Sequence, residues 1–105
     1  MISSILTSQR AFFRSGATLD INFRRQMLQK LQAALAKWEK PLADALWADL
    51  HKSYEEAYLT ELSIVRGEIT NHLRHLGRWS KRRRKSTPLK MFPSRSYIVS
   101  EPLGN

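Results

Sequence analysis

The chain has 105 residues, of which 42% are hydrophobic and 26% are charged, and its formal net charge at pH 7 is +9. This length allows one small domain with a thin core, and the apolar content argues against global disorder. No apolar run approaches the ~20 residues that a membrane-spanning helix needs. The absence of cysteine excludes disulfides, a thiolate nucleophile and cysteine metal sites, and it agrees with the reducing cytoplasm where we expect the protein.

The first 16 residues predict a short amphipathic helix that ends at Gly16, a typical C-terminal cap. Its apolar residues fall roughly on one face: Ile2, Ile5, Leu6, Phe12 and Phe13. The same stretch is rich in serine, carries Arg10 and Arg14, and has no acidic residue before Asp20. A mitochondrial presequence has this composition too, and it remains the alternative interpretation.

The main amphipathic pattern covers residues 20–50, where apolar residues recur at steps of three and four. They are Phe23, Met27, Leu28, Leu31, Leu35, Trp38, Leu42, Ala45, Leu46 and Leu50. Such a stripe is typical of packing against a core rather than of a ligand site. Pro41 favours two helices that meet near residues 38–40, with the proline in the first turn of the second, over one kinked helix.

A capping box marks the start of the next predicted helix, because Ser53 and Glu56 have the spacing for capping each other's amides. Apolar residues at helical spacing continue this helix to Trp79. They are Tyr58, Leu62, Val65, Ile69, Leu73 and Leu76.

Almost all of the excess positive charge follows this helix. Between Arg78 and Arg95 there are eight basic residues and no acidic one, whereas the rest of the chain has ten basic and nine acidic residues. The basic residues are Arg78, Lys81, Arg82, Arg83, Arg84, Lys85, Lys90 and Arg95. The run from Lys81 to Lys85 is compatible with a nuclear signal or a phosphate-binding tract, but adjacent like charges favour a solvated linker.

The C-terminal part predicts a single short strand, Tyr97 to Val99. No partner strand is evident in the sequence, and a lone strand indicates a piece of a longer protein. We therefore expect a mainly α fold of about four helices with one terminal strand. It divides into a helical region at residues 1–79, a basic linker at 80–96 and the start of a sheet at 97–105.

Polar residues that suit chemistry are few. Glu68, His72 and His75 share one helical face, but two histidines need a third ligand and second-shell support, so a solvent-facing polar stripe is the favoured interpretation. His51 follows a helix end, where its charge suits the helix dipole. The sequence has no glycine-rich phosphate loop. It also has no Ser/His/Asp arrangement and no His-Glu-x-x-His motif, so it predicts no catalytic, cofactor-binding or metal-binding residue in this chain.

Several segments, in order along the chain, closely resemble the N-terminal region of the aldehyde dehydrogenases. These segments are Gln9 to Gly16, Thr18 to Ile21 with Phe23 and Arg24, Ala48 to Ser53, Glu56 to Glu61, Thr87 to Leu89, and Ser100 to Gly104. The resemblance is greatest to the branch that acts on fatty and aromatic aldehydes. The run from Lys81 to Lys85 is more basic than this family leads us to expect.

The resemblance implies a parent enzyme with an α/β, Rossmann-like cofactor domain, which uses NAD or NADP to oxidise aldehydes to carboxylic acids. It also implies that the nucleophilic cysteine, the oxyanion-binding asparagine of a Pro-Trp-Asn motif and the glutamate base lie beyond Asn105. We thus expect a structural N-terminal piece whose partners are the remainder of the enzyme and a second copy. The alternative is a small helical module that binds nucleic acid or acidic partners through the segment from Arg78 to Arg95.

Overall fold

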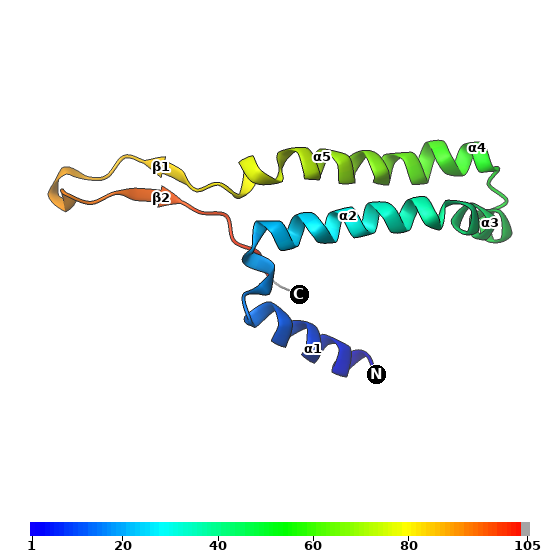
Figure 1. Ribbon diagram of the computed structural model, residues 1–105, viewed down its shortest axis with the longest axis horizontal. Coiled ribbons are helices and arrows are strands. Elements are labelled where there is room, and N and C mark those ends of the chain that lie inside the picture. The colour runs from blue at the N-terminus through cyan, green and yellow to red at the C-terminus, as the bar shows by residue number, and fades with distance from the viewer. Residues whose placement is uncertain (104–105) are drawn as a thin grey trace. The chain divides into compact units, whose positions relative to one another are not determined.

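The computed structural model describes residues 1–103 and is mainly helical (Figure 1). The described residues form two compact units, one made of residues 1–24 with residues from 76 onward, the other of Arg25–His75. The helices are α1 (Ile2–Arg14), α2 (Ile21–Lys37), α3 (Glu39–Leu50), α4 (Tyr54–Ala57) and α5 (Ser63–Ser80), and the strands are β1 (Arg83–Lys85) and β2 (Ser96–Ile98). The predicted mainly α class is therefore confirmed.

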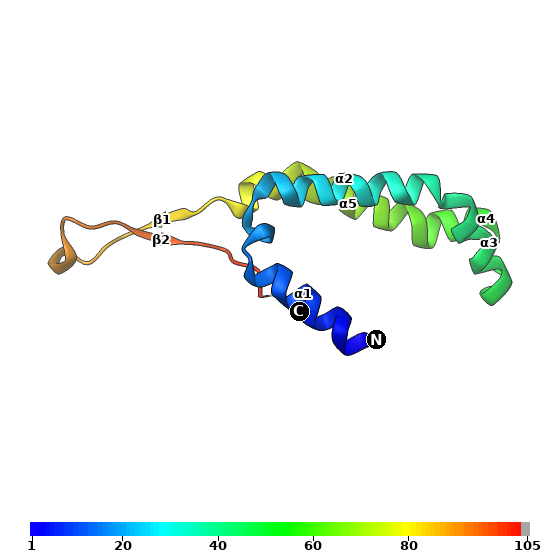
Figure 2. The ribbon, with the colours of Figure 1, turned by 60° about the horizontal axis from the view of Figure 1, so that its bottom comes forward.

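In the unit Arg25–His75, helices α2 and α5 lie side by side and run in opposite directions (Figure 1), and in the turned view one lies in front of the other (Figure 2). Arg25 Nη1 donates a 3.1 Å hydrogen bond to the carbonyl oxygen of Leu73, and Gln32 Nε2 lies 3.3 Å from Thr70 Oγ1. The partners of Arg25 and Gln32 occur in reverse order along α5, which fixes the antiparallel direction. These two polar contacts bridge the helices.

Two helices meet at Trp38, as the position of Pro41 predicts. Helix α2 ends at Lys37 and α3 begins at Glu39, so Pro41 lies in the first turn of α3. A proline is tolerated there because the first amides of a helix have no partner within it. The alternative of one kinked helix is wrong.

The helix predicted from Ser53 to Trp79 is confirmed in extent but contains an unexpected turn. Ser53 Oγ accepts the Glu56 amide at 3.2 Å, which is the capping bond that the sequence predicts. Tyr58–Leu62 then forms a π-helical turn in which the Ser63 amide reaches the carbonyl of Tyr58, five residues back. Such a turn inserts one residue into the α-helical repeat, so the apolar spacing of the sequence does not reveal it.

The core of the described residues is small and lies within the unit Arg25–His75. Its buried apolar side chains are Ala43, Ala57, Leu62 and Ile69. None of the residues of the 20–50 stripe is fully buried, and Leu31, Trp38, Leu42 and Leu50 are exposed. The stripe forms a helical face, as predicted, but residues 1–103 do not cover this face fully.

In the other unit, α1 ends as predicted. Gly16 follows the helix with φ 78°, a left-handed conformation that glycine adopts at little cost. The rings of Phe12 and Phe23 then approach to 5.7 Å between centroids. Arg24 Nε donates to the carbonyl oxygen of Thr18 at 2.5 Å, which fixes the connection between α1 and the start of α2.

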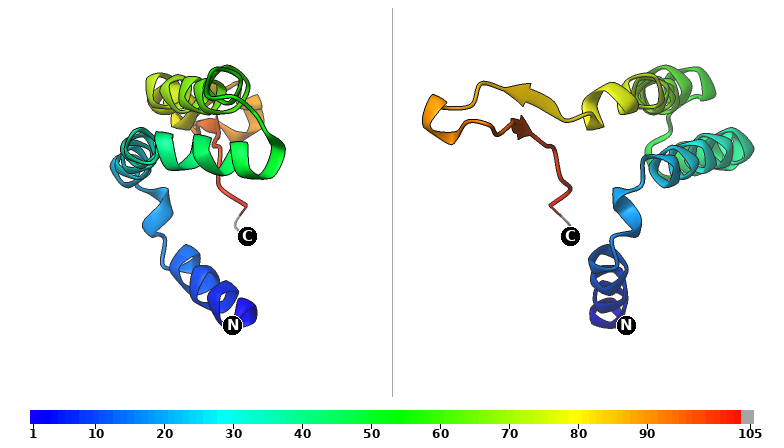
Figure 3. Two further views of the ribbon diagram at one scale, coloured as in Figure 1. Left: turned by 90° about the vertical axis from the view of Figure 1, so that its right-hand side faces the viewer. Right: turned by 60° about the vertical axis from the view of Figure 1, so that its left-hand side comes forward.

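The strand near the C-terminus is paired, which corrects two expectations from the sequence. β1 and β2 form an antiparallel hairpin in which Arg83 pairs with Ile98, Arg84 with Tyr97 and Lys85 with Ser96 (Figure 3). The basic run is therefore not an extended linker throughout, and the predicted strand is not alone. Because the strand is paired, it does not indicate a longer protein. Residues 104–105 of the predicted 97–105 segment lie outside the described residues.

The cross-strand neighbours of the basic side chains explain why this run can form a strand. A cation next to a cation is unfavourable along a chain, but across the hairpin each cation faces an uncharged residue of β2. The Arg82 guanidinium also lies 4.4 Å from the centroid of the Tyr97 ring, a favourable cation–π contact.

Candidate functional site

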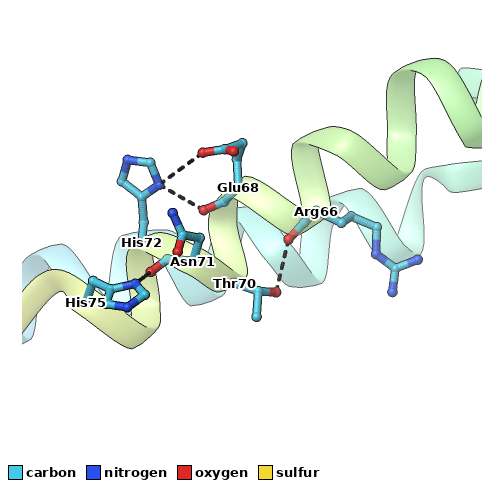
Figure 4. A network of polar contacts seen from close by, with 6 residues as sticks. All are labelled: Arg66, Glu68, Thr70, Asn71, His72 and His75. Carbon is cyan, nitrogen blue, oxygen red and sulfur yellow. Dashed lines mark hydrogen bonds and ion pairs between the residues drawn. The ribbon is translucent and has the colours of Figure 1, made fainter.

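The polar residues of α5 that the sequence singles out lie along one helix but do not form a metal site (Figure 4). His72 Nδ1 is 2.8 Å from the carbonyl oxygen of Glu68 and 3.9 Å from its Oε2. His75 Nδ1 is 2.9 Å from the carbonyl oxygen of Asn71. Both rings thus direct one nitrogen at their own helix backbone, and residues 1–103 contain no group of three histidine or acidic side chains placed to bind a metal.

His51 has a structural role at the end of α3. It adopts φ 53°, and its amide donates a 2.8 Å hydrogen bond to the carbonyl oxygen of Trp47. Its ring also lies 5.3 Å from the Trp47 ring, measured between centroids. These contacts terminate the helix in the left-handed conformation and agree with the predicted position of His51 after a helix end.

A polar junction joins α3, α4 and α5 and was not predicted. Glu39 Oε1 accepts a 2.6 Å hydrogen bond from the Tyr54 hydroxyl, and Glu39 Oε2 lies 3.2 Å from Arg66 Nη1. The hydrogen bond to Glu39 raises the pKa of Tyr54 above its ordinary value of 10.0. One carboxylate therefore holds three helices, an arrangement that stabilises a fold and offers no reactive group.

A second ion pair closes the same end of this unit. Lys52 Nζ lies 2.7 Å from Glu61 Oε1, and this hydrogen bond raises the pKa of Lys52 above 10.5. Sequence reasoning could not identify this pair, because the two residues do not share a helical repeat.

The strongest charge feature is the segment that runs from Arg78, in the last turn of α5, to Arg95 in the hairpin that follows. All eight basic residues between Arg78 and Arg95 are exposed, and none of them forms an ion pair with an acidic residue among residues 1–103. An open hollow of about 670 Å³ lies at the loop between the strands. Its lining is part polar and part apolar: Arg84, Lys85, Ser86, Thr87, Pro88, Leu89, Phe92, Pro93, Ser94 and Arg95. Three of the lining residues are cationic and none is acidic.

The comparisons with known proteins identify the relationship. No family model matches the sequence. The chain is 41% identical over 95 residues to the 4,4'-diaponeurosporen-aldehyde dehydrogenase of Staphylococcus aureus, an alignment that covers 90% of this chain and 21% of that protein. It is 38% identical over 107 residues to the dimeric NADP-preferring aldehyde dehydrogenase of the dog, covering 98% and 23%. It is also 36% identical over 103 residues to human aldehyde dehydrogenase family 3 member B1, covering 98% and 22%.

A solved structure agrees with these relatives. The substrate-bound state of the aldehyde dehydrogenase AldH of Staphylococcus aureus matches 97% of this chain with a TM-score of 0.91 and 38% identity, over 22% of its own length. This chain is homologous to the N-terminal region of the aldehyde dehydrogenases. The resemblance found in the sequence is thereby confirmed.

The extent of the match limits what this chain shares with the enzymes. It spans about a fifth of the length of the curated aldehyde dehydrogenases that it matches. None of the relatives above carries a name that refers to nucleic acid, and nothing found supports the alternative of a nucleic-acid-binding module. No helix within residues 1–103 combines the length and the apolar character that crossing a membrane requires.

Proposed function

We propose that this chain is the N-terminal structural segment of an NAD(P)-dependent aldehyde dehydrogenase that oxidises aldehydes to carboxylic acids. The observation that carries the proposal is the match to AldH, with a TM-score of 0.91 over 97% of this chain. The segment packs against the remainder of the enzyme, and that remainder holds the nucleophile and the cofactor site.

The distribution of apolar side chains supports a packing role. Large apolar residues such as Leu31, Trp38, Leu42 and Val65 are exposed although they belong to the two predicted helical stripes. Contiguous apolar patches on a protein surface usually mark an interface. We infer that the remainder of the enzyme covers these faces, with residues 1–79 as the packing region, 80–96 as the basic segment and 97–105 leading into the cofactor-domain sheet.

The finer assignments follow the relatives and the sequence. The names of the relatives include a diaponeurosporen-aldehyde dehydrogenase and an NADP-preferring enzyme that is dimeric. We propose a parent enzyme of the branch acting on fatty and aromatic aldehydes, which uses NAD or NADP, assembles as a homo-oligomer and works in the cytoplasm. None of these assignments gives a residue of this chain a catalytic role.

The reading frame downstream of Asn105 and the activity of its product test the proposal. A frame that continues into Pro-Trp-Asn, a glycine-rich cofactor segment and a later cysteine is expected, and its product should reduce NAD or NADP when an aldehyde is supplied. Replacing that cysteine by alanine should abolish the reaction, because the aldehyde is attacked by its thiolate. A downstream frame without these motifs, or a product with no aldehyde-dependent activity, would overturn the proposal.

A further inference from the structure

The π-helical turn Tyr58–Leu62 connects α4 to α5 without interrupting the helical backbone. Ala57, Tyr58 and Ser63 all have right-handed helical dihedral angles, with φ between −60° and −67°. The Ser63 amide donates to the carbonyl oxygen of Tyr58, five residues earlier, where an α-helix would use the carbonyl four residues earlier. The turn therefore holds one residue more than the α-helical repeat requires.

This added residue decides which side chains of α4 and α5 share a buried face. Ala57 is 0% exposed, and Leu62 and Ile69 are 7% and 5% exposed. In an uninterrupted α-helix, the step from Ala57 to Leu62 would separate the directions of the two side chains by about 140°. Because the π-helical turn takes up one residue, this separation falls to about 40°, and Ile69 follows Leu62 at an angle of only about 20°. The three buried side chains thus lie on one side of the helix.

An uninterrupted α-helix would bury a different residue. Tyr58 precedes Leu62 by four positions, so it would take the place of Ala57 on the buried face. In the structure Tyr58 is 36% exposed, and its ring lies 6.3 Å from that of Tyr54 in a stacked arrangement, measured between centroids. The Tyr54 hydroxyl in turn donates to Glu39. The π-helical turn therefore directs Tyr58 away from the core and toward the junction of the helices.

The polar junction at Glu39 requires the same added residue. Tyr54 and Arg66 lie on opposite sides of the turn, yet both contact the Glu39 carboxylate, at 2.6 Å and 3.2 Å. Their side chains would point about 120° apart in an uninterrupted α-helix, whereas the turn reduces this angle to about 20°. Within the turn, Glu61 pairs with Lys52 at 2.7 Å and joins it to the connection after α3. The buried face and the junction thus depend on one feature of the backbone.

We propose that the π-helical turn is a register adjuster, which absorbs one inserted residue so that α4 and α5 present one continuous face to the core and to Glu39. Removal of one residue from the turn then gives a regular α-helix with both contacts intact. Without Leu59, the Ser63 amide follows the Tyr58 carbonyl by four positions, so the same hydrogen bond becomes an α-helical one. This proposal does not depend on the activity of the parent enzyme.

Two matched deletions in the 105-residue chain test the proposal, with urea denaturation as the measurement. Leu59 and Ile64 are both apolar and are 67% and 58% exposed. Deletion of Leu59 should change the equilibrium constant for unfolding by less than about fivefold, because it removes an exposed side chain and keeps the buried face. Deletion of Ile64 turns Leu62 and Ile69 about 120° apart, so it should raise this constant at least about 30-fold through the loss of a buried side chain.

A second measurement shows whether the shortened chain keeps the junction. Glu39→Ala should raise the equilibrium constant for unfolding by the same factor, within about twofold, with and without Leu59. The reason is that Tyr54 and Arg66 still meet the same carboxylate when the helix is regular. A Glu39→Ala effect that disappears in the chain without Leu59 would overturn the proposal.

Two substitutions test the register without changing the length of the chain. Ala57→Leu places a larger side chain in a fully buried position and should raise the equilibrium constant for unfolding at least about fivefold. Tyr58→Leu should have a smaller effect, since Tyr58 lies outside the buried face. The reverse order would indicate an uninterrupted α-helix and overturn the proposal. Unfolding of the chain on deletion of Leu59, or equal effects of the two deletions, would overturn it as well.

Discussion

Tyr54 and Glu39 are joined by a 2.6 Å hydrogen bond from the tyrosine hydroxyl to the carboxylate, although they lie 15 positions apart in the chain. Because Arg66 contacts the other oxygen of the same carboxylate at 3.2 Å, the first turns of α3 and α4 and the body of α5 depend on one side chain. Glu39 is therefore the polar centre of the unit Arg25–His75.

Substituting Glu39 by alanine should lower the free energy of unfolding by about 1–2 kcal/mol, because it removes a hydrogen bond and a partly shielded ion pair. The matched control is Asp44→Ala, which removes the exposed pair of Asp44 with Lys40 and should change stability by less than about 0.5 kcal/mol. Urea denaturation followed by circular dichroism measures both. Equal effects of the two substitutions would show that the junction does not hold the helices.

The same junction predicts a loss of stability in alkali. The hydrogen bond to Glu39 raises the pKa of Tyr54 above 10.0, and the hydrogen bond to Glu61 raises that of Lys52 above 10.5. A group whose pKa is higher in the folded state stabilises it fully below the unfolded pKa and loses this contribution as the pH rises through the folded value. Stability should therefore be flat from neutral pH to about 9.5 and fall at higher pH, where both groups begin to titrate.

Substitutions that remove the titrating groups provide the control for this pH dependence. Tyr54→Phe and Lys52→Met should each reduce the fall in stability above pH 10, while they lower stability at neutral pH. Thermal unfolding measured at a series of pH values distinguishes these effects. An unchanged alkaline slope in the double variant would assign the fall to other groups.

The small core makes stability sensitive to a few positions. Ile69 is 5% exposed in α5, so Ile69→Ala should cost about 2–4 kcal/mol through lost burial and the remaining cavity. Ile64 is on the same helix but 58% exposed, and Ile64→Ala should cost less than about 0.5 kcal/mol. Similar losses at the two positions would indicate that another surface covers Ile64 under the conditions of the measurement.

The exposed helical stripes predict that the purified chain self-associates. Leu31, Trp38, Leu42 and Val65 remain exposed within the described residues, and a symmetric dimer is the commonest way to cover such faces. Sedimentation equilibrium across a range of concentrations should show a mass above that of the monomer. A cooperatively folded monomer at high concentration would show that these faces tolerate water.

The purified chain should bind neither NAD nor NADP and oxidise no aldehyde. It contains no cysteine, and its four glycines are too scattered to form a pyrophosphate-binding loop. Calorimetry with each nucleotide measures the binding directly. Micromolar affinity for either one would require a cofactor site made by residues to which we assign only structural roles.

The helices were predictable because their signals are local. The cap at Ser53, the break at Pro41 and the glycine after α1 each act within one helical turn, and the structure has each of them where the sequence predicts it. The π-helical turn Tyr58–Leu62 was not predictable in this way, since it shifts the register without any distinctive residue.

The hairpin and the Glu39 junction were not predictable for a different reason. Pairing of β1 with β2 joins a charge run, which by itself favours an extended chain, to a strand beyond two prolines. Likewise, Glu39 meets Tyr54 and Arg66 only because the connection at residues 51–53 returns the chain to α3. Contacts of this kind depend on tertiary structure, which local sequence patterns do not encode.

We propose above all that this chain serves as the N-terminal segment of an aldehyde dehydrogenase. A chimera tests it, in which this chain replaces the matching first fifth of the Staphylococcus aureus 4,4'-diaponeurosporen-aldehyde dehydrogenase. We predict that the chimera unfolds in one cooperative transition and reduces its nicotinamide cofactor when aldehyde is present, whereas the enzyme deleted of that fifth does neither. A chimera that is as inactive as the deletion, with the grafted segment cleaved rapidly by protease, would contradict the account.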